Sequence, residues 1–118
     1  MGKAQRTKGH SFERKTAEDM RRVGFSEARR QLEYHKDDAQ GVDLQNTGVF
    51  DVQCKAMKKQ PNVPRVFSEM PVDPERIPVV VYKVDRKGTY ATFKWEDAKL
   101  LMGAFDVLGA NPKDLSDI

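Results

Sequence analysis

The sequence predicts one small domain of mixed α and β structure, with a single mixed central β-sheet flanked by helices. Three observations lead to this class. A length of 118 residues suffices for one modest core and not for two. Strand-like and helix-like segments alternate along the chain, as in a sheet covered by helices. The segment Ile77 to Asp85, IPVVVYKVD, is nearly continuously apolar at its start, which is typical of a strand buried on both faces.

The first predicted helix follows a basic segment. Residues 1–10 lack helical periodicity, so we expect a flexible basic arm there and a single domain over residues 11–118. Ser11 is a suitable N-cap. Apolar residues then recur at roughly helical spacing from Phe12, and Gly24 is expected to end the helix.

The remaining elements are bounded by glycine, proline, asparagine or charged turn residues. Strands are expected within residues 25–34 and over residues 42–45, 49–56, 77–85 and 89–95. Short helices are expected over residues 63–70 and 96–105, with a turn-like tail from residue 108. The turn Asn46-Thr47-Gly48 should join two of the strands as a tight hairpin.

The strand over residues 49–56 has two chemically different faces. Its apolar face should point at a helix, because side chains alternate with period two, and it consists of Phe50, Val52, Cys54 and Ala56. The polar face consists of Asp51, Gln53 and Lys55, and Asp43 lies across the hairpin from it. This pattern leaves two interpretations open: a solvated strand edge, or a metal site with a lysine.

The second interpretation has a chemical basis. Mg²⁺ prefers oxygen ligands and keeps several waters, so one or two carboxylates and an amide or carbonyl oxygen suffice. Cleavage of a phosphodiester requires neutralised charge and a nucleophilic water, which a nearby lysine can orient. Asp43, Gln53 and Lys55 meet this description. Asp51 shares their face, but we expect it to be a solvent-facing residue at the start of the strand.

Composition limits the other classes of function. The single cysteine, Cys54, excludes an internal disulfide and a zinc site built from several thiolates, fits a reducing cytoplasm, and is expected to lie in the core. No segment has the length of apolar sequence that a membrane span or secretory signal requires. Residues 1–36 hold ten Lys and Arg against five Asp and Glu, whereas the remaining residues hold eleven against thirteen. This basic third favours a polyanionic partner, most often a nucleic acid.

Several stretches resemble the PD-(D/E)xK nuclease superfamily, and within it the archaeal-type Holliday junction resolvases. KGHSFERKTAEDMRRVGF is similar to the opening of that family, with a glycine, a first helix and an early Glu-Arg. GVDL resembles its Gly-x-Asp strand, FDVQCKA its Glu-x-Lys strand, and IPVVVYKVDRKGTYATFKWED its closing hairpin. The matches run in the family's order from Lys8 to Met102, which makes the set more specific than any one motif.

The resemblance implies a restriction-endonuclease-like αβββαβ core and a homodimer that cuts branched or duplex DNA. It also implies roles for individual residues. Asp43, Glu13, Gln53 and the Cys54 carbonyl would bind Mg²⁺, for which Mn²⁺ substitutes, and Lys55 would be the catalytic lysine. Gln53 replaces the usual Glu, so its neutral amide should bind Mg²⁺ more weakly. Such an enzyme would act in the cytoplasm of a prokaryotic cell or of a phage-infected host.

Two alternatives remain from the sequence. One is a DNA-binding module without activity on the same fold, in which Gln53 marks the loss of catalysis. The other is a nuclease of this fold that cuts flaps, nicks or linear duplex.

We expect Trp95 and the pair Tyr82 and Tyr90 to lie in the core or at a dimer contact. The phosphate contacts are expected from Lys3, Arg6, Lys8, Arg14, Arg29, Arg30, Lys36, Lys58 and Lys59.

Overall fold

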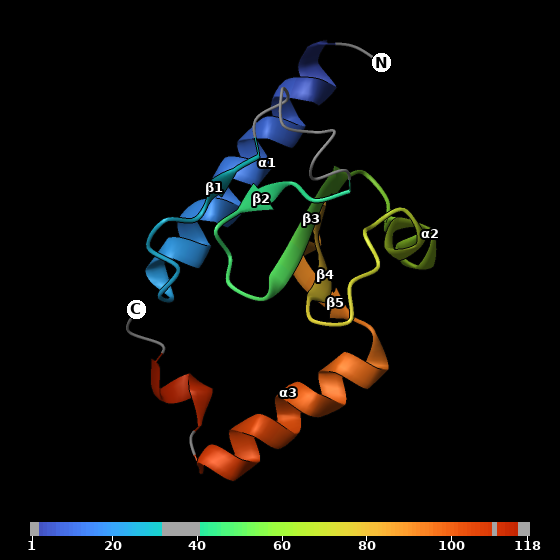
Figure 1. Ribbon diagram of the computed structural model, residues 1–118. Coiled ribbons are helices and arrows are strands. Elements are labelled where there is room, and N and C mark those ends of the chain that lie inside the picture. Colours follow the sequence, from blue (N-terminus) through green and yellow to red (C-terminus); the bar gives the residue numbers. More distant parts are fainter. Residues whose placement is uncertain (1–2, 32–40, 110, 116–118) are drawn as a thin grey trace.

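The computed structural model describes residues 3–31, 41–109 and 111–115 (Figure 1). Its helices are α1 (Lys3–Arg22), α2 (Val63–Ser68), α3 (Trp95–Leu108) and a short 3₁₀ helix, η2 (Pro112–Leu115). Its strands are β1 (Arg29–Arg30), β2 (Leu44–Gln45), β3 (Phe50–Met57), β4 (Ile77–Val84) and β5 (Gly88–Phe93). The combination of helices and mixed strands confirms the expected α+β class. Within the described residues, no helix has the length and apolar character needed to cross a bilayer.

The strands form two sheets instead of the single sheet expected. β3 pairs in parallel with β4, and β4 pairs antiparallel with β5, which makes β4 the central strand as its apolar sequence predicts. β1 and β2 form a separate antiparallel pair. The Asp43 N–H donates to the Val52 carbonyl at 2.8 Å and ties the start of β2 to β3, although the two strands belong to different sheets. The turn therefore joins β2 and β3 as expected, but the two strands do not pair with each other as a hairpin.

One face of the larger sheet packs against α1. Phe12 and Ala17 of the helix share a buried cluster with Val52, Cys54 and Val79 of the strands. The expectation that the apolar face of β3 points at a helix is thus confirmed, and Cys54 lies in the core as expected.

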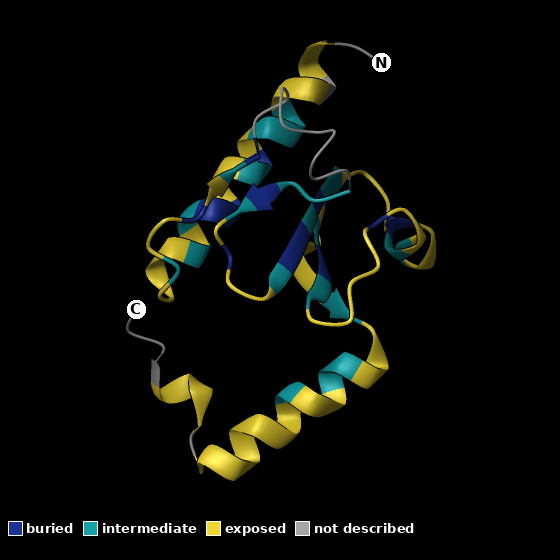
Figure 2. Ribbon diagram, viewed as in Figure 1, coloured by how far each residue is buried: buried dark blue, intermediate teal, exposed yellow. Residues whose placement is uncertain are grey.

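The opposite face packs against α2. Val66 and Met70 share a second buried cluster with Val80, and Phe67 and Tyr82 pack at its border. β4 is thus covered on both faces, because its consecutive valines point alternately at α1 and α2. Figure 2 shows these buried positions concentrated in the strands and on the inner sides of the two helices.

The helix α1 begins earlier than the sequence pattern indicates. The expected arm over residues 1–10 and the N-cap at Ser11 are wrong for the described part, because residues 3–10 are helical. Lys3, Ala4, Arg6 and Thr7 are exposed. Hydrophobic periodicity reports only the turns that pack on a core, so it cannot detect a helical segment that extends beyond the sheet. In the expected strand between Phe25 and Tyr34, only Arg29 and Arg30 are strand, and residues 32–34 lie outside the described ranges.

Gly41 allows the segment before β2 to pass close to the end of α2. Its φ is +81°, in the left-handed region, and a Cβ at this position would lie only 2.5 Å from the Glu69 carbonyl oxygen. Only glycine fits there without displacing backbone. The glycine two residues before Asp43 therefore allows the segment that carries Asp43 to pass closely against the end of α2.

Candidate active site

Asp43 lies at the edge of β3 that faces β2. The Cys54 N–H donates to Asp43 Oδ2 at 2.8 Å. The Asp43 carbonyl also accepts from the Gln31 N–H at 2.6 Å, so the backbone of Asp43 is held from both sides. Within a strand, the N–H and C=O of one residue point to the same edge. The Cys54 carbonyl therefore also faces the side on which the Asp43 carboxylate lies.

Glu13 reaches the same region from α1. Its side chain is largely buried, and Oε1 lies 3.8 Å from Nη1 of Arg30, which is also largely buried. β1 places Arg30 there, since Arg30 is the register partner of Leu44, the neighbour of Asp43. We expected Arg30 to contact phosphate, and its pairing with Glu13 was not anticipated. Residues on a two-residue strand give no periodic signal that could reveal such a contact.

The thiol of Cys54 lies near both acids. Burial is the main cause that raises the pKa of this thiol, and the negative charges of Asp43 and Glu13 raise it further, whereas a hydrogen bond with Thr16 lowers it. The carboxylates of Glu13 and Asp43 thus both lie near Cys54 of β3, although they come from two different segments of the chain.

A reactivity measurement tests this environment. Because a raised pKa leaves the thiol protonated, Cys54 should not react with a disulfide reagent in the folded protein at about pH 8, where a free cysteine is partly ionised. It should react fully once urea unfolds the chain. Rapid labelling of the folded protein would contradict the buried position of Cys54.

Gln53 and Lys55 project from the other face of β3, toward α2. Gln53 Oε1 is buried and has no hydrogen-bond partner within the described residues. It borders a cavity of about 460 Å³ lined also by Gly41, Val66 and Glu69. Lys55 is half-buried on the same face of the strand. The structure therefore brings Glu13, Asp43 and the Cys54 backbone together, while the Gln53 and Lys55 side chains leave from the opposite face.

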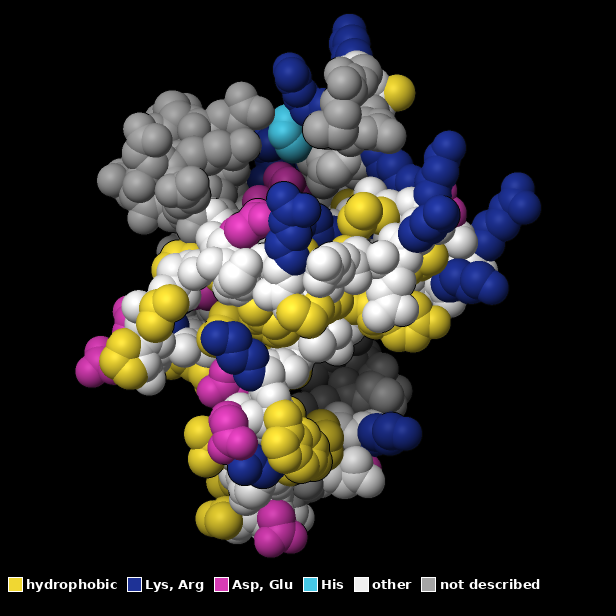
Figure 3. Space-filling view, turned by 90° about the vertical axis from the view of Figure 1, so that its right-hand side faces the viewer, with side chains coloured by type: hydrophobic (Ala, Val, Ile, Leu, Met, Phe, Trp, Pro, Cys, Tyr) yellow, Lys and Arg dark blue, Asp and Glu magenta, His cyan; other side chains and the backbone are white. Residues whose placement is uncertain are grey.

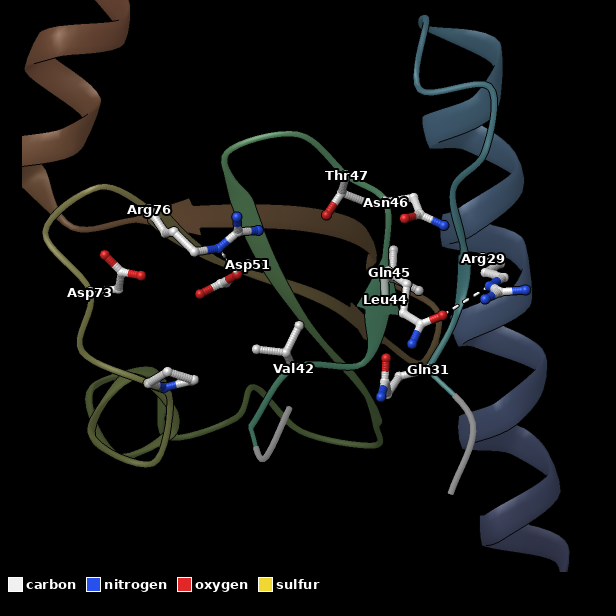
Figure 4. A pocket seen from close by; sticks show the side chains of 11 residues that line it. Arg29, Gln31, Val42, Leu44, Gln45, Asn46, Thr47, Asp51, Asp73 and Arg76 are labelled. Atoms are coloured by element: carbon white, nitrogen blue, oxygen red, sulfur yellow. Dashed lines mark hydrogen bonds and ion pairs between the residues drawn. The ribbon is translucent and has the colours of Figure 1, made fainter. Parts of the chain in front are cut away.

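Asp51 does not face solvent, so our expectation for this residue is wrong. It is buried, and its carboxylate accepts a hydrogen bond from Nε of Arg76. Arg76 also donates to the carbonyls of Gly48 and Phe50, at 3.1 and 3.3 Å. Figure 4 shows this pair at one end of a polar pocket, with Asp73 beside it. Arg76 neutralises Asp51, which is therefore a structural acid. The two residues are 25 positions apart in the sequence, so no local pattern indicates the pair.

Removing Arg76 should destabilise the fold. Arg76→Ala leaves the buried Asp51 carboxylate without its partner, and we expect a loss of about 2 kcal/mol in the free energy of unfolding, measured by urea denaturation. The control is Arg65→Ala, which removes the exposed pair between Arg65 and Glu69 and should cost less than about 0.5 kcal/mol. Equal losses in the free energy of unfolding would show that the buried pair stabilises the fold no more than the exposed pair does.

The basic residues expected at phosphate divide into three groups. Lys8 pairs with Asp85 at 2.8 Å, and Arg29 donates to Gln45 Oε1 at 2.8 Å. Lys36 lies outside the described residues. The others, besides Arg30, are exposed: Lys3, Arg6, Arg14, Lys58 and Lys59. In the space-filling view of Figure 3, Lys and Arg side chains gather in the upper half, the half that holds the start of α1.

Comparisons of the chain with protein-family models, with curated proteins and with solved structures gave no match. In the described part of the chain, no group of three His, Cys, Asp or Glu side chains is placed to hold a metal ion. A metal site here would need the Gln53 amide or the Cys54 carbonyl in addition to the two carboxylates.

Proposed function

We propose that this protein is a Mg²⁺-dependent, structure-specific DNA endonuclease whose substrate is a four-way Holliday junction. The observation that carries the proposal is the position of Asp43. Its carboxylate is held against the Cys54 N–H at the edge of β3, where the charge of Glu13 also acts. The family-like motifs lie far apart in the sequence, and two of their three acidic or amide positions converge on this edge, which supports the proposal.

The oxygen donors around β3 fit a magnesium ion at this edge, with Gln53 contributing from the opposite face of the strand. Gln53 Oε1 is a buried oxygen donor without a partner in the described protein, and burying an uncompensated amide oxygen is costly. A cation would relieve that cost, and oxygen donors are the ligands that Mg²⁺ prefers. Asp43, Glu13 and the Cys54 carbonyl would hold the ion at this edge, with Mn²⁺ as a substitute, and the Gln53 amide would turn toward it from the opposite face of β3. When bound, it would neutralise charge on the phosphodiester and lower the pKa of a water molecule.

The residues of the chain supply orientation and charge balance. The Cys54 N–H fixes the rotamer of Asp43, so its second oxygen has a defined direction. Arg30 balances the charge of Glu13 in a largely buried position. Lys55 would offset the charge of the bound phosphate and orient the attacking water, since it is the ammonium group nearest to Gln53 along β3.

The partner is proposed to be branched DNA, bound by a homodimer. The exposed cations of α1, together with Lys58 and Lys59 just after β3, lie on either side of the candidate site along the chain. Such cations bind phosphate without regard to sequence, so affinity should fall steeply with salt. A two-fold protein carries two sites, which suits symmetric cutting of a junction.

Cleavage of defined substrates tests the proposal. The protein is incubated with Mg²⁺ and labelled four-way junction, linear duplex or flap DNA, beside Asp43→Ala. We expect paired, symmetric nicks in the junction alone, and their loss in the variant. Cutting of flap or duplex in preference to the junction would keep the nuclease and change its substrate.

The neutral side chain of Gln53 favours one other candidate, a DNA-binding module without activity. In that case, the wild-type protein would bind the junction tightly and leave it uncut in Mg²⁺ and in Mn²⁺. The same experiment therefore decides between the two functions.

A further inference from the structure

The helix α3 exposes large apolar side chains that nothing in the described structure buries. It extends away from the sheet in Figure 1, and in the described structure none of its 14 residues is buried. Its large apolar side chains are nevertheless numerous. Trp95, Met102 and Phe105 are 63%, 56% and 42% exposed. In Figure 3, hydrophobic side chains crowd the lower part of the view, where α3 lies. Trp95 is thus not in the core, the first of the two positions expected for it.

A helix in this state needs a covering surface. Isolated helices of fewer than about 12–15 residues are marginal in water, and most helical stability comes from packing an apolar face. An apolar patch of this kind on a monomer marks an interaction site. We infer that α3 pairs antiparallel with α3 of a second copy of this chain, about a two-fold axis that passes between Met102 and Gly103.

The arrangement of residues around α3 supports this pairing. Trp95, Met102 and Phe105 fall on one side of the helix at spacings of seven and three, with the small residue Ala98 among them. With this axis, residues 97–108 of the two helices overlap over about 18 Å, which gives about three layers of contacts, and Trp95 lies just beyond the overlap. The contact is at the small end for stable dimers, and we expect micromolar affinity, of about 10⁻⁶–10⁻⁵ M.

Charge selects a second copy as the partner. Lys99 and Asp106 are seven residues apart, so both lie on the same flank of the apolar side. They are also equally far from the point between Met102 and Gly103. In an antiparallel two-fold pair, like flanks face each other, and Lys99 of each copy meets Asp106 of the other. Each Lys99 would exchange its exposed contact with Glu96, at 2.8 Å, for this one.

This inference names the surface of the proposed dimer, but it does not depend on cleavage. The oligomeric state can be measured without DNA or metal. A protein that dimerises but does not cut DNA would support the pairing of α3 and contradict the proposed reaction. A monomer that cuts DNA would support the reaction and contradict the pairing.

Charge exchange in the full chain tests the register. Sedimentation velocity should show a concentration-dependent dimer for the wild type. Lys99→Asp places like charges opposite each other twice and should weaken the dimer at least about 10-fold. The double variant Lys99→Asp with Asp106→Lys should restore it. A dimer that Lys99→Asp leaves unchanged, or a double variant no better than the single one, would overturn the pairing.

Crosslinking tests the face. Met102→Cys should form a disulfide-linked dimer on mild oxidation, since the two-fold axis passes beside this position, while Leu100→Cys, on the far side of α3, should not. Both positions are exposed, so neither change disturbs the fold, and Cys54 is buried. If the chain stays monomeric at all concentrations and crosslinks equally at both positions, α3 does not pair with a second copy, and the inference is refuted.

Discussion

Lys55→Ala should lower the rate of junction cleavage by about 10²–10⁴-fold, the usual range for a group that assists proton transfer or orients the nucleophile. Lys55 is half-buried on β3, on the same face as Gln53 and two residues from it. Its side chain is therefore less free to move than that of an exposed surface lysine. Since only one of many cations is removed, junction affinity should stay within a few-fold of the wild type, as measured by a binding titration in Ca²⁺.

The matched control is Lys58→Ala, which removes an exposed lysine just past the end of β3. It should reduce affinity slightly and leave the single-turnover rate at saturation unchanged, because a phosphate contact acts through binding. If Lys55→Ala behaves in the same way as Lys58→Ala, Lys55 is a phosphate contact and has no part in the chemistry. A fully active Lys55→Ala protein would remove lysine from the mechanism altogether.

The strands that form the core were predictable because each carries its own signal. β3 alternates polar and apolar side chains, and β4 is nearly continuously apolar at its start, so their positions and their burial follow from the pattern of apolar residues. The same pattern predicted which side of β3 packs on a helix. The break between β2 and β3 carries no such signal, because strand periodicity does not reveal which strands join one sheet.

The partners of the charged residues were not predictable in the same way. Asp51 was expected in solvent and is buried against Arg76, and Arg30 was expected at phosphate and lies beside Glu13. Both pairs depend on tertiary packing between segments far apart in the chain. A charge in the sequence shows that a partner or solvent is needed, and only the fold decides which.

The helix α3 was predicted as a helix, but its exposure was not. Apolar residues at helical spacing indicate that a face is covered, without indicating whether the same chain covers it. Trp95 illustrates this, since it was assigned to the core or to a dimer contact, and its exposure contradicts the first of these positions.

Gln53→Glu should convert the candidate metal site into a stronger one. The change adds a negative charge where Gln53 Oε1 is buried without a partner in the described chain, beside a cavity that Glu69 also borders. Mg²⁺ should then half-saturate cleavage at a concentration about 10-fold lower, since an ionised carboxylate attracts the cation more strongly than an amide does.

The same change gives a measurement that does not depend on activity. Without metal, a buried carboxylate near Glu69 is uncompensated, so Gln53→Glu should unfold at a lower temperature than the wild type, by the equivalent of about 1–3 kcal/mol. Added Mg²⁺ should restore most of that loss, because a ligand that binds only the folded state stabilises it. The wild type should gain less from Mg²⁺. Gln60→Glu is the control, since Gln60 is exposed and its change should alter neither quantity. A Gln53→Glu protein that is destabilised and gains nothing from Mg²⁺ would show that no cation reaches Gln53, and the metal would then have to be held by Asp43 and Glu13 without it.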